Sequence, residues 1–149
     1  MRPVLFAAVA SLALAAAGIA AAATIEVRDA WIRTPPPGAP TAAGYATLDN
    51  HEISSDRLMG GHTATASVGL HQMSMAGGVM RMRPVTGGLP IGASASVNLT
   101  PGGYHLMLTG LKAPLKAGQH VKIVLQFQRA GNIAADFVVR DAGPGGMHM

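Results

Sequence analysis

The 149-residue sequence contains no cysteine. Disulfide bonds are therefore excluded, and so is every metal site that needs a thiolate, including the blue-copper electron-transfer sites. A folded domain of this chain must be stabilised by its hydrophobic core. Any chemistry with soft metal ions must use donor atoms other than thiolate sulfur.

Aromatic and charged side chains are scarce as well. The chain has three Phe, two Tyr and one Trp, and 12% of its residues are charged. The basic residues are scattered, with no stripe and few aromatic residues between them, which argues against nucleic acid as a partner. Without Arg2, ten Lys and Arg residues stand against seven Asp and Glu residues, and so mild a positive charge is typical of a solvated surface.

Residues 1–23 form an apolar leader. Met1 and Arg2 precede an apolar stretch over residues 4–16, and a run of small residues ends at Ala23. This layout is typical of a secretory signal peptide that is cleaved at a site of the A-x-A kind. A retained membrane anchor is the alternative, although roughly 20 apolar residues are barely long enough to span a bilayer. We therefore expect an exported protein with no stable membrane span after cleavage.

The rest of the chain predicts one β domain over residues 24–142 and a short tail over residues 143–149. Several segments alternate apolar and polar residues with period two and are bounded by Gly, Pro, Asn and Asp, which is typical of short strands. These segments are 25–28, 44–49, 67–73, 94–99, 104–108, 121–127 and 133–139. Because no segment after residue 23 has a long helical stripe, we expect an all-β fold, either an antiparallel sandwich or a Greek-key barrel.

Methionine is unusually abundant, with nine copies in the chain. Two histidine and methionine pairs have the spacing of neighbours on one face of a strand, namely His71 with Met73 and His105 with Met107. Residues two apart on a strand project from the same face, so each pair can share one ion. The sequence therefore predicts two short strands that present imidazole and thioether groups.

The segment over residues 76–83 adds a third piece to this set. Its two glycines permit a tight turn, which can bring Met80 or Met82 back over the strand that carries His71. No carboxylate lies near these groups in the sequence. Imidazole and thioether donors suit Cu(I), whereas Ca, Mg and Mn prefer oxygen. Thioether also carries no proton at ordinary pH, so metal binding there does not compete with protonation.

The order and spacing of these residues resemble the periplasmic copper chaperones often written PCu(A)C. The signature of that family is His, about ten residues, Met, about twenty-one residues, and then His-x-Met. In this chain the middle gap is twenty-two residues, one more than usual. The similarity extends to 70–75, 78–85 and 101–108 around the matching residues and to 30–33, 36–38 and 43–45 near the start. It covers nearly the whole chain after the leader.

This resemblance implies a cupredoxin-like β-barrel in the periplasm that binds Cu(I) at an exposed site. It also implies delivery of copper to the binuclear centre of cytochrome c oxidase, alone or together with the thioredoxin-like chaperone Sco. Met73, Met75 and Met80 match no ligand position, so they either surround the site or pack in the core. The four ligands that the resemblance assigns are His71, Met82, His105 and Met107.

The tail ends in Met147, His148 and Met149. Two interpretations stay open for it: an unstructured end, or a second copper site that captures Cu(II) or helps to load the main site. The other histidines have no potential co-ligand at a useful spacing, and we expect them on the surface; they are His51, His62 and His120.

Two other functions of a copper-binding protein are alternatives to a chaperone. A copper enzyme, such as an oxidase or a dismutase, usually needs more histidines converging on an open coordination position, and the six histidines here are spread along the chain. A copper storage or resistance protein would use the same ligands as a chaperone and would differ only in not transferring the metal. We therefore expect a copper chaperone and no enzyme, with storage as the alternative.

Overall fold

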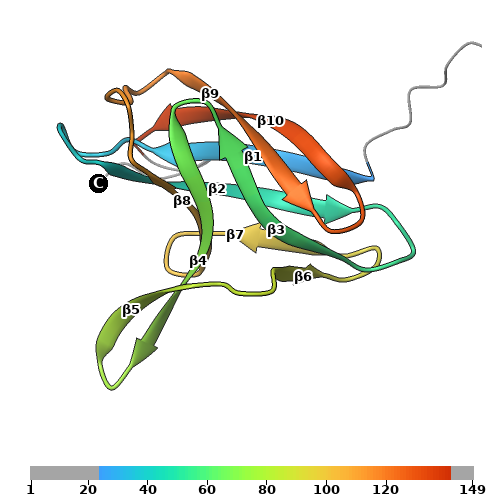
Figure 1. Cartoon of the computed structure of the whole chain (residues 1–149). Coiled ribbons are helices and arrows are strands. Elements are labelled where there is room, and N and C mark those ends of the chain that lie inside the picture. Colours follow the sequence, from blue (N-terminus) through green and yellow to red (C-terminus); the bar gives the residue numbers. More distant parts are fainter. Residues whose placement is uncertain (1–23, 142–149) are drawn as a thin grey trace, which may run out of the picture.

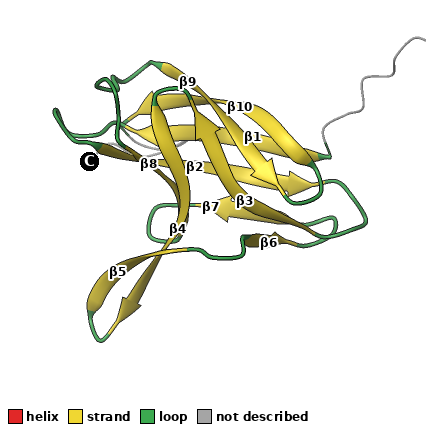
Figure 2. Ribbon diagram, in the orientation of Figure 1, coloured by secondary structure: helices red, strands yellow, loops and turns green. Residues whose placement is uncertain are grey.

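The computed structural model describes residues 24–141, which contain ten β-strands and no helix (Figures 1 and 2). The strands are β1 (Ile25–Arg33), β2 (Thr41–Asn50), β3 (Asp56–Thr63), β4 (Ala66–Ala76), β5 (Val79–Pro84), β6 (Leu89–Ile91), β7 (Ser96–Leu99), β8 (Tyr104–Thr109), β9 (His120–Phe127) and β10 (Gly131–Arg140). Nothing in this part of the chain forms a helix that could cross a membrane. The predicted leader over residues 1–23 and the predicted copper site at Met147, His148 and Met149 lie outside the described residues.

Seven of these strands close into a barrel. Their order is β4-β8-β2-β1-β10-β9-β3, and β3 pairs back onto β4. β5 extends the sheet beyond β4, while β6 and β7 pair with β3 and β2. The all-β prediction is confirmed. One pair differs from the antiparallel expectation, because β1 and β10 run parallel and are joined by the whole intervening barrel.

The period-two alternation places one face of each barrel strand in the core. On β9, Val121, Ile123, Leu125 and Phe127 are buried, as the alternation predicts. On β8, Leu106 and Leu108 are fully buried in the core, so His105 and Met107, which alternate with them, lie on the opposite face of the strand. Burial of each such side chain contributes about 1.5–3 kcal/mol relative to exposure. The core thus fixes which face of β8 carries His105 and Met107.

A bulge in β1 changes which residues of that strand face outward. Asp29 has a φ of 52°, and the register of β1 against β2 shifts between Arg28 and Trp31. As a result, Ile25 and Ile32 both lie in the core although they are an odd number of residues apart. A bulge re-aims the side chains that follow it. Here it places Trp31 on the outer face of the barrel.

β3 is the longest strand that the sequence pattern did not predict. The adjacent Gly60 and Gly61 resemble a turn, yet both lie inside β3. A Cβ on Gly61 would lie 2.9 Å from Cγ1 of Val68 and 3.3 Å from the carbonyl oxygen of Val124. Glycine is therefore needed there because β4 and β9 both approach β3 closely.

β4 and β5 form a hairpin that extends away from the barrel, at the lower left of Figure 1. Gly77 and Gly78 form its turn with φ values of 59° and 79°. Positive φ at both central residues is what a type I′ hairpin turn requires, and only glycine adopts it readily. The predicted tight turn is thus confirmed, and all residues of β5 are exposed.

Candidate metal centre

Two histidines lie at the centre of the candidate site. His71 on β4 is directly opposite His105 on β8, and their ring centroids are 6.1 Å apart with planes inclined by 23°. Within residues 24–141, three buried side-chain nitrogen or oxygen atoms lack a hydrogen-bond partner, and two of them are Nδ1 of His71 and Nε2 of His105. A buried nitrogen without a partner is costly unless something else binds it. A metal ion is a partner that both imidazoles can accept.

The position of the proton on His105 follows from its surroundings. Nδ1 of His105 lies 3.3 Å from the carbonyl oxygen of Gly103. A carbonyl oxygen only accepts, so Nδ1 carries the proton and Nε2 has a free lone pair. Burial lowers the pKa of His105; the hydrogen bond to Gly103 opposes this, and nearby His71 lowers the pKa further. The imidazole is therefore neutral at pH 7 and ready to bind a metal ion through Nε2.

Met107 shares the outer face of β8 with His105. It is half-buried, and its cross-strand neighbour on β4 is Gly69. Gly69 leaves the space beside Met107 without a side chain. A Cβ at this position would lie 3.3 Å from Cε1 of His71, which is tighter than an ordinary contact. Gly69 thus makes room for both the thioether of Met107 and the ring of His71.

The hairpin register separates the two candidate methionines of β5. Met82 is directly opposite Met73, and Met80 is directly opposite Met75. Met73 follows His71 by one strand step on the same face, so Met82 is a diagonal neighbour of His71, within reach of a long side chain. Met80 lies one step farther out. The register therefore favours Met82 over Met80 as the fourth donor.

A wall of aromatic rings covers one side of His105. Tyr45 on β2 lies beside it, with ring centroids 6.3 Å apart, and Trp31 on β1 lies 4.8 Å from Tyr45 by the same measure. Both rings are almost fully buried, and Arg33 lies over the indole of Trp31 at 5.9 Å. A row of rings thus crosses four strands, formed by Trp31, Tyr45, His105 and His71. The sequence pattern did not predict this row, because it depends on the bulge at Asp29.

The structure also places the other predicted residues. Met73 is half-buried, while Met75 and Met80 are exposed, and all three lie on the same hairpin face as Met82. None of the three belongs to the hydrophobic core. His62 is exposed on β3, as expected.

Two surface histidines have partners that the sequence did not reveal. His51 Nε2 lies 3.0 Å from Oε2 of Glu26, and His120 Nδ1 lies 2.6 Å from Oδ2 of Asp136. Both histidines are exposed, so their placement on the surface is correct. The His120 pair joins β9 to β10, and the His51 pair joins the residue after β2 to β1, so spacing along the chain could not indicate them.

One of these pairs belongs to a second group of possible metal donors. Glu26, Asp49 and His51 each present one donor atom within 4.8 Å of the others. Asp49, however, is already bound by the guanidinium of Arg28 and the hydroxyl of Ser96, and these hydrogen bonds lower its pKa to about 2. Arg28 therefore supplies the cation that this cluster needs.

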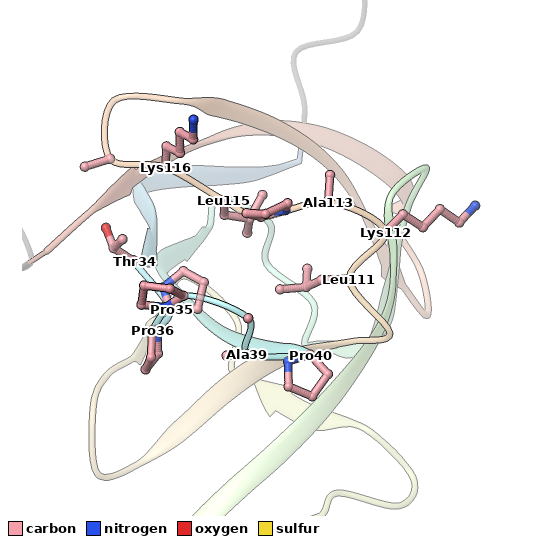
Figure 3. A pocket seen from close by; sticks show the side chains of 14 residues that line it. Thr34, Pro35, Pro36, Ala39, Pro40, Leu111, Lys112, Ala113, Leu115 and Lys116 are labelled. Atoms are coloured by element: carbon pink, nitrogen blue, oxygen red, sulfur yellow. The ribbon is translucent and has the colours of Figure 1, made fainter.

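An apolar groove of about 570 Å³ lies between the loops over residues 34–40 and 111–117 (Figure 3). Its lining is mostly proline, alanine and leucine, and Figure 3 shows the ammonium groups of Lys112 and Lys116 pointing away from it. None of the predicted metal ligands lines it. The groove offers no imidazole or thioether donor and is separate from the candidate metal centre.

Comparison with known proteins gives the family. The sequence model of a protein family described as putative lipoprotein LpqE-like matches residues 25–139. The chain belongs to the LpqE-like family. This LpqE-like chain is 30% identical over 118 residues to the putative lipoprotein Lxx21020 of Leifsonia xyli subsp. xyli, a match that spans 78% of this chain and 70% of that protein.

Solved structures resemble the LpqE-like chain over most of its length. The solution structure of Cu(I)-bound DR1885 from Deinococcus radiodurans is 32% identical, covers 82% of both chains and has a TM-score of 0.61. The copper-bound PCuAC domain from PmoF2 has a TM-score of 0.67 and covers 80% of this chain and 94% of the domain. At 24% identity the latter shows the fold alone. These neighbours agree with the predicted cupredoxin-like barrel and support the resemblance to PCu(A)C proteins.

Proposed function

We propose that this LpqE-like protein is a periplasmic copper chaperone that binds one Cu(I) and delivers it to the copper-bearing subunit of cytochrome c oxidase. The ligands are His71, Met82, His105 and Met107. The observation that carries the proposal is the pair of buried, unpartnered imidazole nitrogens on facing strands, with methionines on the same face. The Cu(I)-bound neighbour DR1885, which is 32% identical to this chain, supports the same metal.

The donor set explains the choice of Cu(I). Imidazole and thioether groups bind a metal ion in their uncharged forms, so this set suits a monovalent soft ion and lacks the anionic ligands that hard divalent cations need. No carboxylate is among the residues on this face of β4, β5 and β8. The proposed function involves no catalytic residue, and a protein with this function is not an enzyme.

Exposure supports transfer as the task of the site. Met82 is 47% exposed on a hairpin that projects from the barrel, whereas His105 is 3% exposed. An ion held between them can be approached by a recipient from the hairpin side. A storage or resistance protein is the alternative function, and it would keep the metal.

Metal transfer separates the two functions. The Cu(I)-loaded full chain is mixed under anaerobic conditions with the copper-free soluble domain of the oxidase subunit, the proteins are separated, and the copper in each is measured. A chaperone loses its copper to the oxidase domain, and adding Sco tests whether the two act together. Retention of copper in the presence of excess recipient would contradict delivery and favour storage. His105→Ala, loaded under the same conditions, serves as the control for loosely bound metal.

The tail requires its own experiment. We propose that Met147, His148 and Met149 bind Cu(II) or help to load the main site. A chain truncated after Gly146 is expected to keep one Cu(I) and to lose Cu(II) binding. If the truncated chain bound as many Cu(I) and Cu(II) ions as the full chain, the proposal of a copper site in the tail would be wrong.

A further inference from the structure

The hairpin of β4 and β5 carries more methionine than one copper site needs. Four thioethers lie on one of its faces as two directly opposed pairs: Met73 with Met82, and Met75 with Met80. Directly opposite residues on antiparallel strands have Cβ atoms about 4.5–5.5 Å apart, so the two sulfurs of each pair can converge on one ion. Successive pairs are one strand step of two residues apart, roughly 7 Å. The two pairs thus lead from the hairpin turn toward His71.

The outer pair lies in solvent. Met75 is 69% exposed and Met80 is 48% exposed. Side chains this exposed contribute little to the core, and methionine in such a position is open to oxidation. Within residues 24–141 the exposed large apolar side chains are Ile53, Met59, Met75, Val79, Met80 and Met82, so four of the six belong to this hairpin. Their concentration on one small element calls for a role other than packing.

The chemistry of this face is uniform. The opposed pairs present only thioether sulfur and methyl groups, whereas polar side chains such as Arg81 and Arg83 alternate with them and project from the other face. Thioether is a neutral soft donor that selects Cu(I) among the common metal ions. We propose that Met75 and Met80 form a second, weaker Cu(I) site that passes the ion through Met73 and Met82 to the histidine pair. This inference rests on the proposed copper function and adds a route to it.

Each step of the route is a ligand exchange. The ion leaves the sulfurs of the outer pair as it gains those of Met73 and Met82. It then releases Met73 as it gains the imidazole nitrogens of His71 and His105 and the sulfur of Met107. Copper stays monovalent throughout, because no electron donor or acceptor takes part. The exchange between sulfurs moves no proton, since thioether carries none. Two ions so close would repel each other, so the outer pair binds a second ion only weakly while the inner site is full.

Silver titration tests the outer site directly. The full chain, labelled with ¹³C at its methionine methyl groups, is titrated with Ag(I), which has the same charge and similar ligand preferences but is stable in air. The first equivalent is expected to shift the methyl signals of Met82 and Met107, and the second those of Met75 and Met80. Met59, which is 45% exposed on β3, is the internal control. The proposal would be overturned if, after two equivalents of Ag(I), the methyl signals of Met75 and Met80 had shifted no more than the methyl signal of Met59.

Kinetics tests the route. The variant Met75→Leu/Met80→Leu keeps the shape of the hairpin and removes both outer sulfurs, and Met59→Leu is the matched control. We expect the double variant to take up Cu(I) from a chelator complex several-fold more slowly than the wild type, with unchanged affinity for the first equivalent. Equal rates would overturn the route. Failure of the wild type to bind the first equivalent would overturn both the route and the copper function, so the two failures are distinguishable.

Discussion

His71 and His105 face each other across β4 and β8, with ring centroids 6.1 Å apart and one unpartnered buried nitrogen on each ring. An unsatisfied buried polar group costs about 1–3 kcal/mol. In the absence of metal, this pair therefore weakens the fold at the place where the methionines gather. Binding of an ion that accepts both lone pairs removes this cost.

Metal loading should therefore raise the thermal stability of the protein. Saturating Cu(I), at about 1,000 times its dissociation constant, is expected to add about 4 kcal/mol to the free energy of unfolding. The variant His71→Leu/His105→Leu should be at least as stable as the metal-free wild type, because both unpaired nitrogens are gone. Calorimetry with and without Cu(I) measures this. A metal-dependent rise in Tm that persists in the double variant would place the ion elsewhere.

Gly69→Ala should weaken copper binding without unfolding the chain. The new methyl group would lie 3.3 Å from Cε1 of His71 and would push the ring from its position opposite His105. We expect roughly a tenfold loss of Cu(I) affinity, similar to the loss of a residue that supports a ligand. Gly44→Ala is the matched control, since its methyl group meets only ordinary contacts in the core, the nearest at 3.6 Å. Equal affinities for the two variants would contradict the role given to Gly69.

Tyr45 should matter for its ring and not for its hydroxyl. Tyr45→Ala opens a cavity beside His105 and should cost about 3 kcal/mol of stability, together with a measurable loss of Cu(I) affinity. Tyr45→Phe keeps the ring and should keep the affinity. Chemical denaturation and chelator competition measure the two effects. A Phe variant as weak as the Ala variant would show that the hydroxyl is what the site needs.

Acid should weaken the fold through Asp49. The hydrogen bonds from Arg28 and Ser96 lower the pKa of Asp49 from 3.8 to about 2. Stability from this group is complete above pH 3.8 and is lost as the pH falls from 3.8 towards 2, because the unfolded chain binds the proton first. Asp49→Asn should flatten that part of the stability profile, measured by denaturation at each pH. Glu52→Gln is the control, because Glu52 is exposed and belongs to none of the ion pairs in the described part of the chain. Identical stability profiles for the Asp49 and Glu52 variants would contradict this account.

Local parts of the site follow from the sequence. Leu106 and Leu108 alternate with His105 and Met107, and burial of the leucines fixes the outward face of β8. Two adjacent glycines at 77 and 78 predict the hairpin turn that returns β5 over β4. Period-two alternation and turn residues are local signals, and they therefore predict strands and hairpins well.

The assembly of the site depends on contacts that local patterns do not contain. The pairing of β4 with β8 joins segments more than thirty residues apart in the chain, and a shift of one residue would turn one histidine to the other face. The bulge at Asp29 sends Trp31 outward to meet Tyr45, although the pattern before it predicts the opposite face. The glycines in β3 are likewise required by neighbours distant in sequence.

The central claim is that His71, Met82, His105 and Met107 hold the ion, and competition with a Cu(I) chelator tests it most directly. His105→Ala and Met107→Ala should each weaken Cu(I) binding beyond the roughly 10- to 100-fold range typical for a supporting residue. Met82→Ala should weaken it more than Met80→Ala does, in line with the hairpin register. Met73→Ala should cost less than about tenfold. Equal losses from His105→Ala, Met107→Ala and Met73→Ala would contradict the ligand assignment.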